Sequence, residues 1–175
     1  MTLISVDIEA DGPCPGLYSM VCFGAVVVEP SLSETFYGKT APISEEFVPE
    51  ALVVSGYSRH DHLHFHNAKH EMEDFDSWLG NMENKYGRLT MISDNPAFDW
   101  QFINYYLHRF VGKNRLGFSA RRIGDLYCGM VKDGSRNKDW KKKYRKTAHD
   151  HNPLNDAKSN AEAVLSIAET IKNLL

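Results

Sequence analysis

The spacing of apolar and polar residues predicts three β-strands in the first part of the chain. In residues 3–8, "LISVDI", apolar and polar side chains alternate between the two faces of an extended segment. Residues 20–28 form the longest apolar run, which is typical of a central strand covered on both faces. Residues 34–43 predict a third strand, and we expect the three segments to form an antiparallel meander.

The second part of the chain alternates between helical and strand-like patterns. Apolar residues recur at spacings of three and four in three segments, 68–86, 98–111 and 157–171. Residues 88–93 and 120–126 predict short strands. This order predicts the α/β class, with one five-stranded mixed sheet and helices on both faces. Because no repeat, low-complexity tract or linker divides the chain, we expect residues 1–175 to form a single domain.

Charge is unevenly distributed along the sequence. With 175 residues and 42% apolar side chains, the chain is large enough for a full hydrophobic core. The net charge of −3 does not by itself indicate a nucleic-acid partner. However, residues 132–146 hold eight Lys or Arg and two Asp, a local charge of +6 that leaves −9 for the other 160 residues.

Cysteine usage and hydropathy indicate the compartment. The three cysteines are an odd number without a C-x-x-C pair, which predicts a reducing environment and no structural zinc. The apolar run at 20–28 is shorter than the ~18–20 residues that span a bilayer. We therefore expect a soluble, cytoplasmic protein with no membrane partner.

Two carboxylates on the first strand are the first candidates for chemistry. Asp7 and Glu9 are two positions apart and therefore point to the same side of a strand. Neighbouring carboxylates raise each other's pKa unless a cation joins them. The alternative is an edge strand whose outer face is in contact with solvent. Partners elsewhere in the chain would decide between the two interpretations.

Two helix starts supply such partners. "DNPAFD" (94–99) and "HNPLND" (151–156) both place Asn at an N-cap and Pro at the first helical position. Both then carry an acid in the first turn, Asp99 and Asp156. Acidic residues are common in first turns, but here the pattern occurs twice, near what we expect to be the same edge of the sheet. Together with the two acids of the first strand, four carboxylates would converge.

Four converging carboxylates predict a divalent metal site. Sites built only from oxygen ligands favour Mg²⁺ or Mn²⁺, and a pair of such ions supports displacement at phosphorus. This reaction also needs a group that removes a proton from water, which His does well near neutral pH. His151 precedes the cap residue and Asp156 is the fourth helical residue, two positions that meet in a hydrophobic staple. Nothing in the sequence fixes the direction of His149.

Three short motifs resemble those of the DEDDh exonucleases. "VDIEADG" (6–12) is similar to the first motif of that family, Asp-x-Glu on the first strand. "NPAFD" (95–99) resembles the second motif, and "HNPLNDA" (151–157) resembles the third. "PEALVVSGYS" (49–58) is similar to the segment between the first two motifs in the proofreading-subunit branch. The resemblance spans nearly the whole chain and implies an RNase H-like fold.

The resemblance also implies a function and a set of site residues. Members release nucleotides from a 3′ end in a metal-dependent reaction, which implies single-stranded RNA or DNA as partner and two Mg²⁺ or Mn²⁺ ions as cofactors. Carried over to this sequence, Asp7, Glu9 and Asp156 would hold the first ion. Asp7 would also contact the second ion, and Asp99 would act directly or through water. His151 would be the general base, with Glu9 beside it in the catalytic set.

Two features depart from the family pattern. Glu9 is followed by Ala10-Asp11-Gly12 where many members have small hydroxyl residues, and Asp94 adds a fifth acid. The short chain is most similar to small bacterial and phage exoribonucleases, including the polyadenylate-specific 3′-exoribonuclease type, which implies RNA as the substrate. A DNA exonuclease of the same fold is one alternative. A non-catalytic nucleic-acid-binding module is another, and it should lack a metal carboxylate, whereas none is missing here.

Seven residues are candidates for contacting the nucleic acid: Gly12, Asn95, Phe98, Lys141, Lys142, Lys143 and Arg145. An aromatic ring at a helix start can stack on a base, and Lys or Arg side chains can meet phosphates. The alternatives are a core position for the ring and a solvated surface for the charges.

A histidine-rich segment invites a different interpretation. Residues 59–70 contain five of the eight histidines, and His60, His62, His64 and His66 would share one face of a strand. A regulatory zinc site would use such a face, but no matching Cys or His pair stands at zinc-finger spacing. A solvated loop or a subunit contact is favoured, which leaves a homodimer open.

Overall fold

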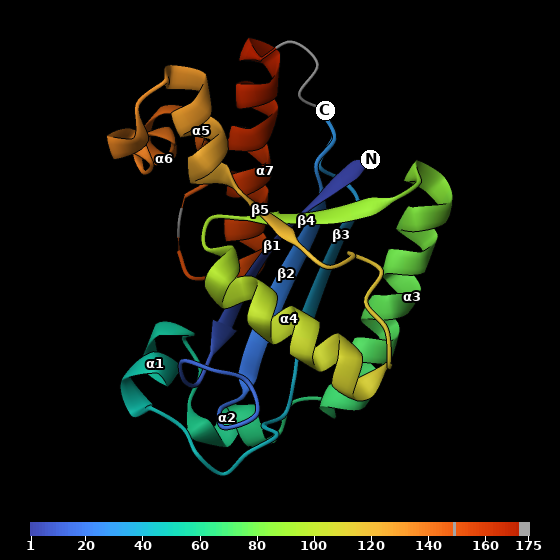
Figure 1. Ribbon diagram of the computed structural model, residues 1–175. Coiled ribbons are helices and arrows are strands. Elements are labelled where there is room, and N and C mark those ends of the chain that lie inside the picture. The colour runs from blue at the N-terminus through green and yellow to red at the C-terminus, as the bar shows by residue number, and fades with distance from the viewer. Residues whose placement is uncertain (149, 172–175) are drawn as a thin grey trace.

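One five-stranded mixed sheet forms the centre of the protein. The computed structural model describes residues 1–148 and 150–171. The strands are β1 (Thr2–Ala10), β2 (Met20–Val27), β3 (Thr35–Lys39), β4 (Leu89–Ser93) and β5 (Ala120–Arg122). Their order is β3-β2-β1-β4-β5 (Figure 1). The pairs β3–β2 and β2–β1 are antiparallel, whereas β1–β4 and β4–β5 are parallel, which confirms the predicted meander and mixed sheet.

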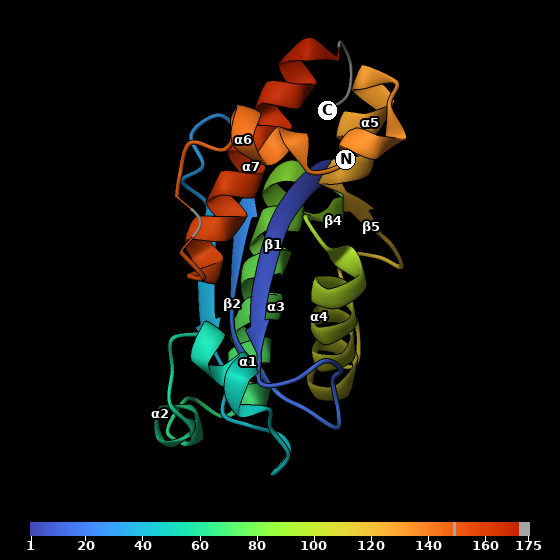
Figure 2. The same ribbon diagram turned by 90° about the vertical axis from the view of Figure 1, so that its left-hand side faces the viewer.

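Helices cover both faces of this sheet, as predicted. They are α1 (Pro49–Val54), α2 (Arg59–Leu63), α3 (Ala68–Tyr86), α4 (Pro96–Phe110), α5 (Ile123–Val131), the 3-10 helix η1 (Gly134–Arg136), α6 (Asp139–Tyr144) and α7 (Pro153–Thr170). Helices α3 and α4 pack on one face and α5, α6 and α7 on the other. Figure 2 shows α4 and α7 on opposite sides of β1.

Alternation along β1 explains why this strand can carry charge in the middle of the sheet. Ile4, Val6 and Ile8 are buried in the core beneath α3 and α4. The residues that alternate with them, which include Asp7 and Glu9, therefore point to the face covered by α7. Strand β2, covered on both faces, is buried along its whole length, as its continuous apolar pattern predicts.

The segment predicted as a strand over 120–126 differs from the structure. Strand β5 ends at Arg122, and α5 begins at the next residue. Ile123 and Tyr127 are four positions apart and bury their side chains against α7, so tertiary packing favours the helix. The predicted third strand is also shorter than 34–43 and ends at Lys39.

Among the described residues, no helix combines the length and apolar character needed to cross a membrane. All three cysteines are free.

Candidate active site

The start of α7 approaches the sheet beside Asp7 because one residue has no side chain. Asp7 pairs with Gly24 of β2. A Cβ atom at Gly24 would lie only 2.5 Å from the backbone N and Cα of Leu154, closer than packing allows. The missing side chain thus lets the first turn of α7 rest directly on β2. This contact brings Asp156, which is 1% exposed, to the face of β1 that carries Asp7.

A buried hydrogen bond ties the same turn to β1. The hydroxyl of Ser5 donates to the carbonyl oxygen of Ala157 at 2.8 Å. Ser5 and Asp7 are two positions apart on β1 and share a face. The residue that follows Asp156 is therefore fixed to the strand that carries the first two acids.

The cap of α7 fixes the position of His151. Asn152 is the N-cap, and its side chain accepts hydrogen bonds from the backbone N–H groups of Leu154 and Asn155. Asp150 accepts from the N–H of Asn152 at 3.0 Å and from the side chain of Asn155 at 2.9 Å. Between these groups His151 adopts a left-handed backbone with φ 59°, which is uncommon for a residue other than glycine.

This geometry brings the imidazole to the acids of β1 and α7. His151 Nδ1 lies 3.5 Å from Glu9 Oε1, and the candidate ligand atoms of Glu9, His151 and Asp156 all lie within 4.8 Å of one another. The His151 side chain is 50% exposed, compared with 13% for Glu9. The imidazole therefore lies at the rim of the site. His149 lies outside the described residues.

Asp99 approaches the cluster from the first turn of α4. It is 4% exposed, and its backbone N–H donates to Asn95 O at 3.0 Å. Burial raises the pKa of Asp99 to about 7, and the nearby Asp94 carboxylate adds to this, whereas Ser93 and backbone N–H groups lower it. Helix α4 thus supplies a fourth buried acid.

The other three carboxylates all raise the pKa of Asp7. Burial is the main cause of its raised pKa, followed by repulsion from Asp99, Asp156 and Glu9 in that order. A bound divalent cation would reverse this repulsion by favouring the ionised forms. The four carboxylates therefore suit a hard cation such as Mg²⁺, which prefers oxygen ligands.

Comparisons with known proteins identify relatives of this chain. No family model matches the sequence. The 3′-5′ DNA exonuclease Cap18 of Escherichia coli is 36% identical over 165 residues, covering 91% of this chain and 87% of that protein. The nuclease domain of 3′hExo, a DEDDh family member solved with bound rAMP, superposes with a TM-score of 0.73 over 96% of this chain and 92% of that one. The chain belongs to the DEDDh family of 3′-5′ exonucleases.

More distant DEDDh-like structures share the fold. The nuclease domain of 3′hExo is 16% identical to this chain. Exonuclease I of E. coli, in a zinc-bound complex with single-stranded DNA, gives a TM-score of 0.67 at 15% identity, covering 99% of this chain and 41% of that one. An RNase H-like architecture and dependence on a divalent metal thus follow from the family and from the acidic cluster.

Three residues of the first two DEDDh motifs are predicted to contact nucleic acid, and their side chains differ in exposure. Asn95 is exposed and begins α4, but its side chain makes no capping hydrogen bond. Phe98 is half-buried, with its ring centroid 5.2 Å from that of Phe102. Gly12 is buried, and a Cβ there would lie 2.2 Å from the ring of Tyr18. The absence of a side chain at Gly12 thus serves close packing.

Two of the four basic residues predicted to contact nucleic acid pair with an acid of the protein itself. Lys141 forms an ion pair with Asp94, and Arg145 Nη2 lies 3.9 Å from the same carboxylate. The guanidinium of Arg145 also donates to Asn160 Oδ1 at 2.6 Å and lies 4.8 Å from the Trp140 ring centroid. The positive charges of Lys141 and Arg145 are therefore balanced within the protein. Asp94, the additional acid next to the second motif, serves as their partner.

The other two lysines of this set face solvent. Lys142 and Lys143 are exposed and line a cavity of about 340 Å³ together with Tyr127, Arg136 and Asp139. Their amines are accessible to solvent, and their contact with phosphates stays a prediction.

The four alternating histidines do not all share a face, because Arg59–Leu63 form helix α2 and not a strand. Of these four described residues, only His60 and His64, one turn apart, have rings close together, with centroids separated by 4.4 Å. His62 is fully buried, and burial lowers its pKa to about 4. Its Nδ1 lies 3.6 Å from Asp11, which also accepts from the backbone of Ser19 at 2.5 Å and from Arg59 at 2.9 Å. Asp11 is thus a structural acid.

Two residues that position the site escaped sequence analysis. Gly24 interrupts the apolar run at 20–28, and an isolated glycine in a strand is a sign of close backbone approach. Ser5 gives no comparable sign, because its partner lies 152 positions away.

Proposed function

We propose that the protein removes nucleotides from the 3′ end of single-stranded nucleic acid with the help of two divalent ions. The observation that carries this proposal is the convergence of four carboxylates from β1, α4 and α7, with His151 at the rim. Asp7, Glu9 and Asp156 would hold one ion, and Asp7 with Asp99 the other. When bound, Mg²⁺ or Mn²⁺ would stabilise charge on the phosphate and make the attacking water more acidic.

In this proposal His151 removes the proton from the attacking water. An imidazole can accept a proton at neutral pH and return it to solvent. The side chain is half exposed, so both substrate and solvent can reach it. Glu9, 3.5 Å from Nδ1, is placed to orient the ring and to stabilise the imidazolium that forms.

Different observations favour RNA and DNA as the substrate. The resemblance to small exoribonucleases predicts RNA, and this stays a prediction. The relative at 36% identity is named for action on DNA, which makes single-stranded DNA the second candidate substrate. Both candidates use the same site, since the phosphodiester chemistry does not involve the 2′-hydroxyl.

A labelled-strand assay tests the proposal. DNA and RNA strands of the same sequence, labelled at either end, would be incubated with Mg²⁺, Mn²⁺ or EDTA. We expect a 5′ label to give a ladder of progressively shorter strands and a 3′ label to give mononucleotide at once, both abolished by EDTA. Asp7→Asn should remove nearly all turnover. Degradation from the 5′ end, or turnover in EDTA, would overturn the proposal.

A further inference from the structure

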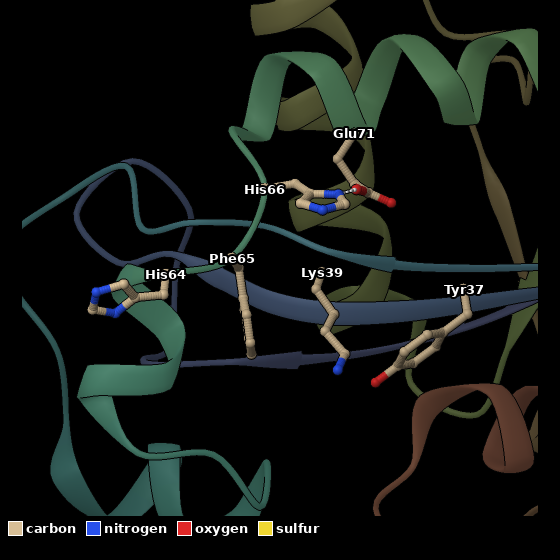
Figure 3. Close-up of a pocket in the computed structure, with 6 residues that line it drawn as sticks. All are labelled: Tyr37, Lys39, His64, Phe65, His66 and Glu71. Carbon is tan, nitrogen blue, oxygen red and sulfur yellow. Dashed lines mark hydrogen bonds and ion pairs between the residues drawn. The ribbon is translucent and has the colours of Figure 1, made fainter.

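A separate cavity lies at the exposed edge of β3. Its volume is about 390 Å³, and its lining residues are Tyr37, Lys39, His64, Phe65, His66 and Glu71 (Figure 3). Tyr37 and Lys39 are two positions apart on β3 and point to the same side. In Figure 3 the Lys39 amine and the Tyr37 hydroxyl extend toward one space beside Phe65, and the His66–Glu71 pair lies at the opposite border.

Lys39 brings a positive charge to this cavity. Its Nζ lies 4.8 Å from the ring centroid of Tyr57, 5.3 Å from that of Phe65 and 5.7 Å from that of Tyr37. Within the part of the chain that the structure describes, no carboxylate forms an ion pair with it. Glu71, the acid of the cavity, pairs with His66 at 3.2 Å instead. A cation among aromatic rings can bind an anion and a planar group together.

The cavity lies beside the candidate active site, because Glu9 pairs with Cys22 of β2 and Cys22 pairs with Lys39 of β3. Tyr37 also lines an adjoining cavity of about 230 Å³, whose walls include Tyr57, His151 and Asn152. The hydroxyl groups of Tyr37 and Tyr57 lie 3.1 Å apart and share a hydrogen bond. Tyr37 is therefore shared by the cavity that contains Lys39 and the cavity that contains His151.

We propose that this cavity binds a nucleotide of the strand whose 3′ end lies in the active site. The proposal rests on the proposed function. Lys39 contacts a phosphate upstream of the cleaved bond, and the base packs against Phe65, the aromatic ring beside Lys39 in the cavity lining. Cationic contacts and stacking on aromatic rings are the usual means of holding a single strand without reading its sequence. The cavity thus sets how strongly longer strands bind.

Lys39→Met tests this role, with Lys113→Met as the matched control. Lys113 is an exposed lysine that pairs with Asp76 of α3. On a strand of roughly eight nucleotides, Lys39→Met should raise KM about tenfold or more and leave kcat unchanged. A dinucleotide, which occupies only the site, should be cleaved as by the wild type. Lys39→Arg, which keeps the charge, should retain most of the affinity for the longer strand.

Binding measurements separate the two proposals. In an Asp7→Asn background, the salt slope of strand binding should fall by about 0.7 when Lys39 is replaced, the value for one phosphate of a single strand. If the wild type cleaves both substrates and Lys39→Met alters neither KM nor slope, this inference fails while the proposed function stands. If the wild type cleaves neither, the proposed function fails. Competition by free mononucleotide that depends on Lys39 and equals that of the strand would assign the cavity to free nucleotides and overturn the inference.

Discussion

The buried carboxylates make the stability of the metal-free protein depend on pH. The pKa of Asp99 is raised from 3.8 to about 7, mainly by burial, and that of Asp7 is raised by burial and its three acidic neighbours. Such a group stabilises the fold fully below its unfolded pKa, and this contribution is lost as pH rises through the folded pKa. We therefore expect the Tm without metal to fall by several degrees between about pH 4 and about pH 8.

Thermal unfolding in EDTA at a series of pH values would check this expectation. Asp99→Asn should flatten the curve, because the neutral amide cannot ionise. Added Mg²⁺ should raise the Tm more at the upper end of the pH range than at the lower end. A Tm that increases steadily with pH in EDTA would contradict the assignment of the cluster.

The backbone of His151 determines which substitution tests its role. At φ 59°, Asn is tolerated better than Ala, so His151→Asn removes the base with little added strain. We expect kcat to fall by roughly 10²–10⁴, the usual scale for a general base, with Mn²⁺ affinity retained in calorimetry. His149→Asn should cost much less. The reverse order of the two variants would show that the base is misassigned.

Among single residues, the acids and His151 can be predicted from the sequence more readily than the residues that position them. Asp99, His151 and Asp156 stand at fixed positions relative to a helix start, and the Asn-Pro pair that marks each start is a local signal in the sequence. The Lys141–Asp94 ion pair joins residues far apart in the chain, so the basic run gives no sign of it. The contact between Gly24 and Leu154 is non-local in the same way.

Between elements, the contact of α7 with β2 can be tested by one added methyl group. Gly24→Ala would place a Cβ 2.5 Å from backbone atoms of Leu154, and backbone cannot move aside cheaply. We expect a loss of about 1–3 kcal/mol in the free energy of unfolding, the usual cost of overpacking, and weaker binding of Mn²⁺. Chemical denaturation and calorimetry would measure the two effects.

Gly129→Ala is the matched control. Gly129 lies within α5, and a Cβ there meets nothing within 4 Å in the described part of the chain. Because Ala favours a helix over Gly, this variant should be more stable than the wild type by up to about 1 kcal/mol. Equal effects at both positions would mean that α7 can shift away from β2 without loss.

Long elements with a strong period are predicted well, and short ones are not. The nineteen residues of α3 repeat their apolar positions often enough to identify the helix. By contrast, α1, α2 and α6 have five or six residues each, too few for a period to emerge. Where α5 begins, the sequence predicts a strand and the structure has a helix, because burial against α7, and not local propensity, decides the conformation.

Across the whole molecule, the basic segment contains two kinds of residue, because Lys141 and Arg145 face Asp94 and their neighbours do not. Lys142 and Lys143 remain exposed, so replacing both with Met should weaken strand binding and reduce the salt slope by about 0.7 for each phosphate that is no longer neutralised. Lys141→Met should change the slope less, since its charge already meets Asp94. Anisotropy titrations at several salt concentrations would compare the two variants. An unchanged slope in the double variant would assign these lysines to a solvated surface.

The central place of β1 in the sheet has a consequence for how the site is lost. β1 is paired with β2 over residues 4–10 and with β4 over residues 2–5, so the amides in its central part should exchange with solvent only through global unfolding. The start of α7 is held by its cap, by the Ser5 bond and by contact with β2, a smaller set of interactions. Local detachment of this turn would therefore separate Asp156 from Asp7 while the sheet stays folded. On gentle heating, activity should disappear before the sheet's circular dichroism signal does.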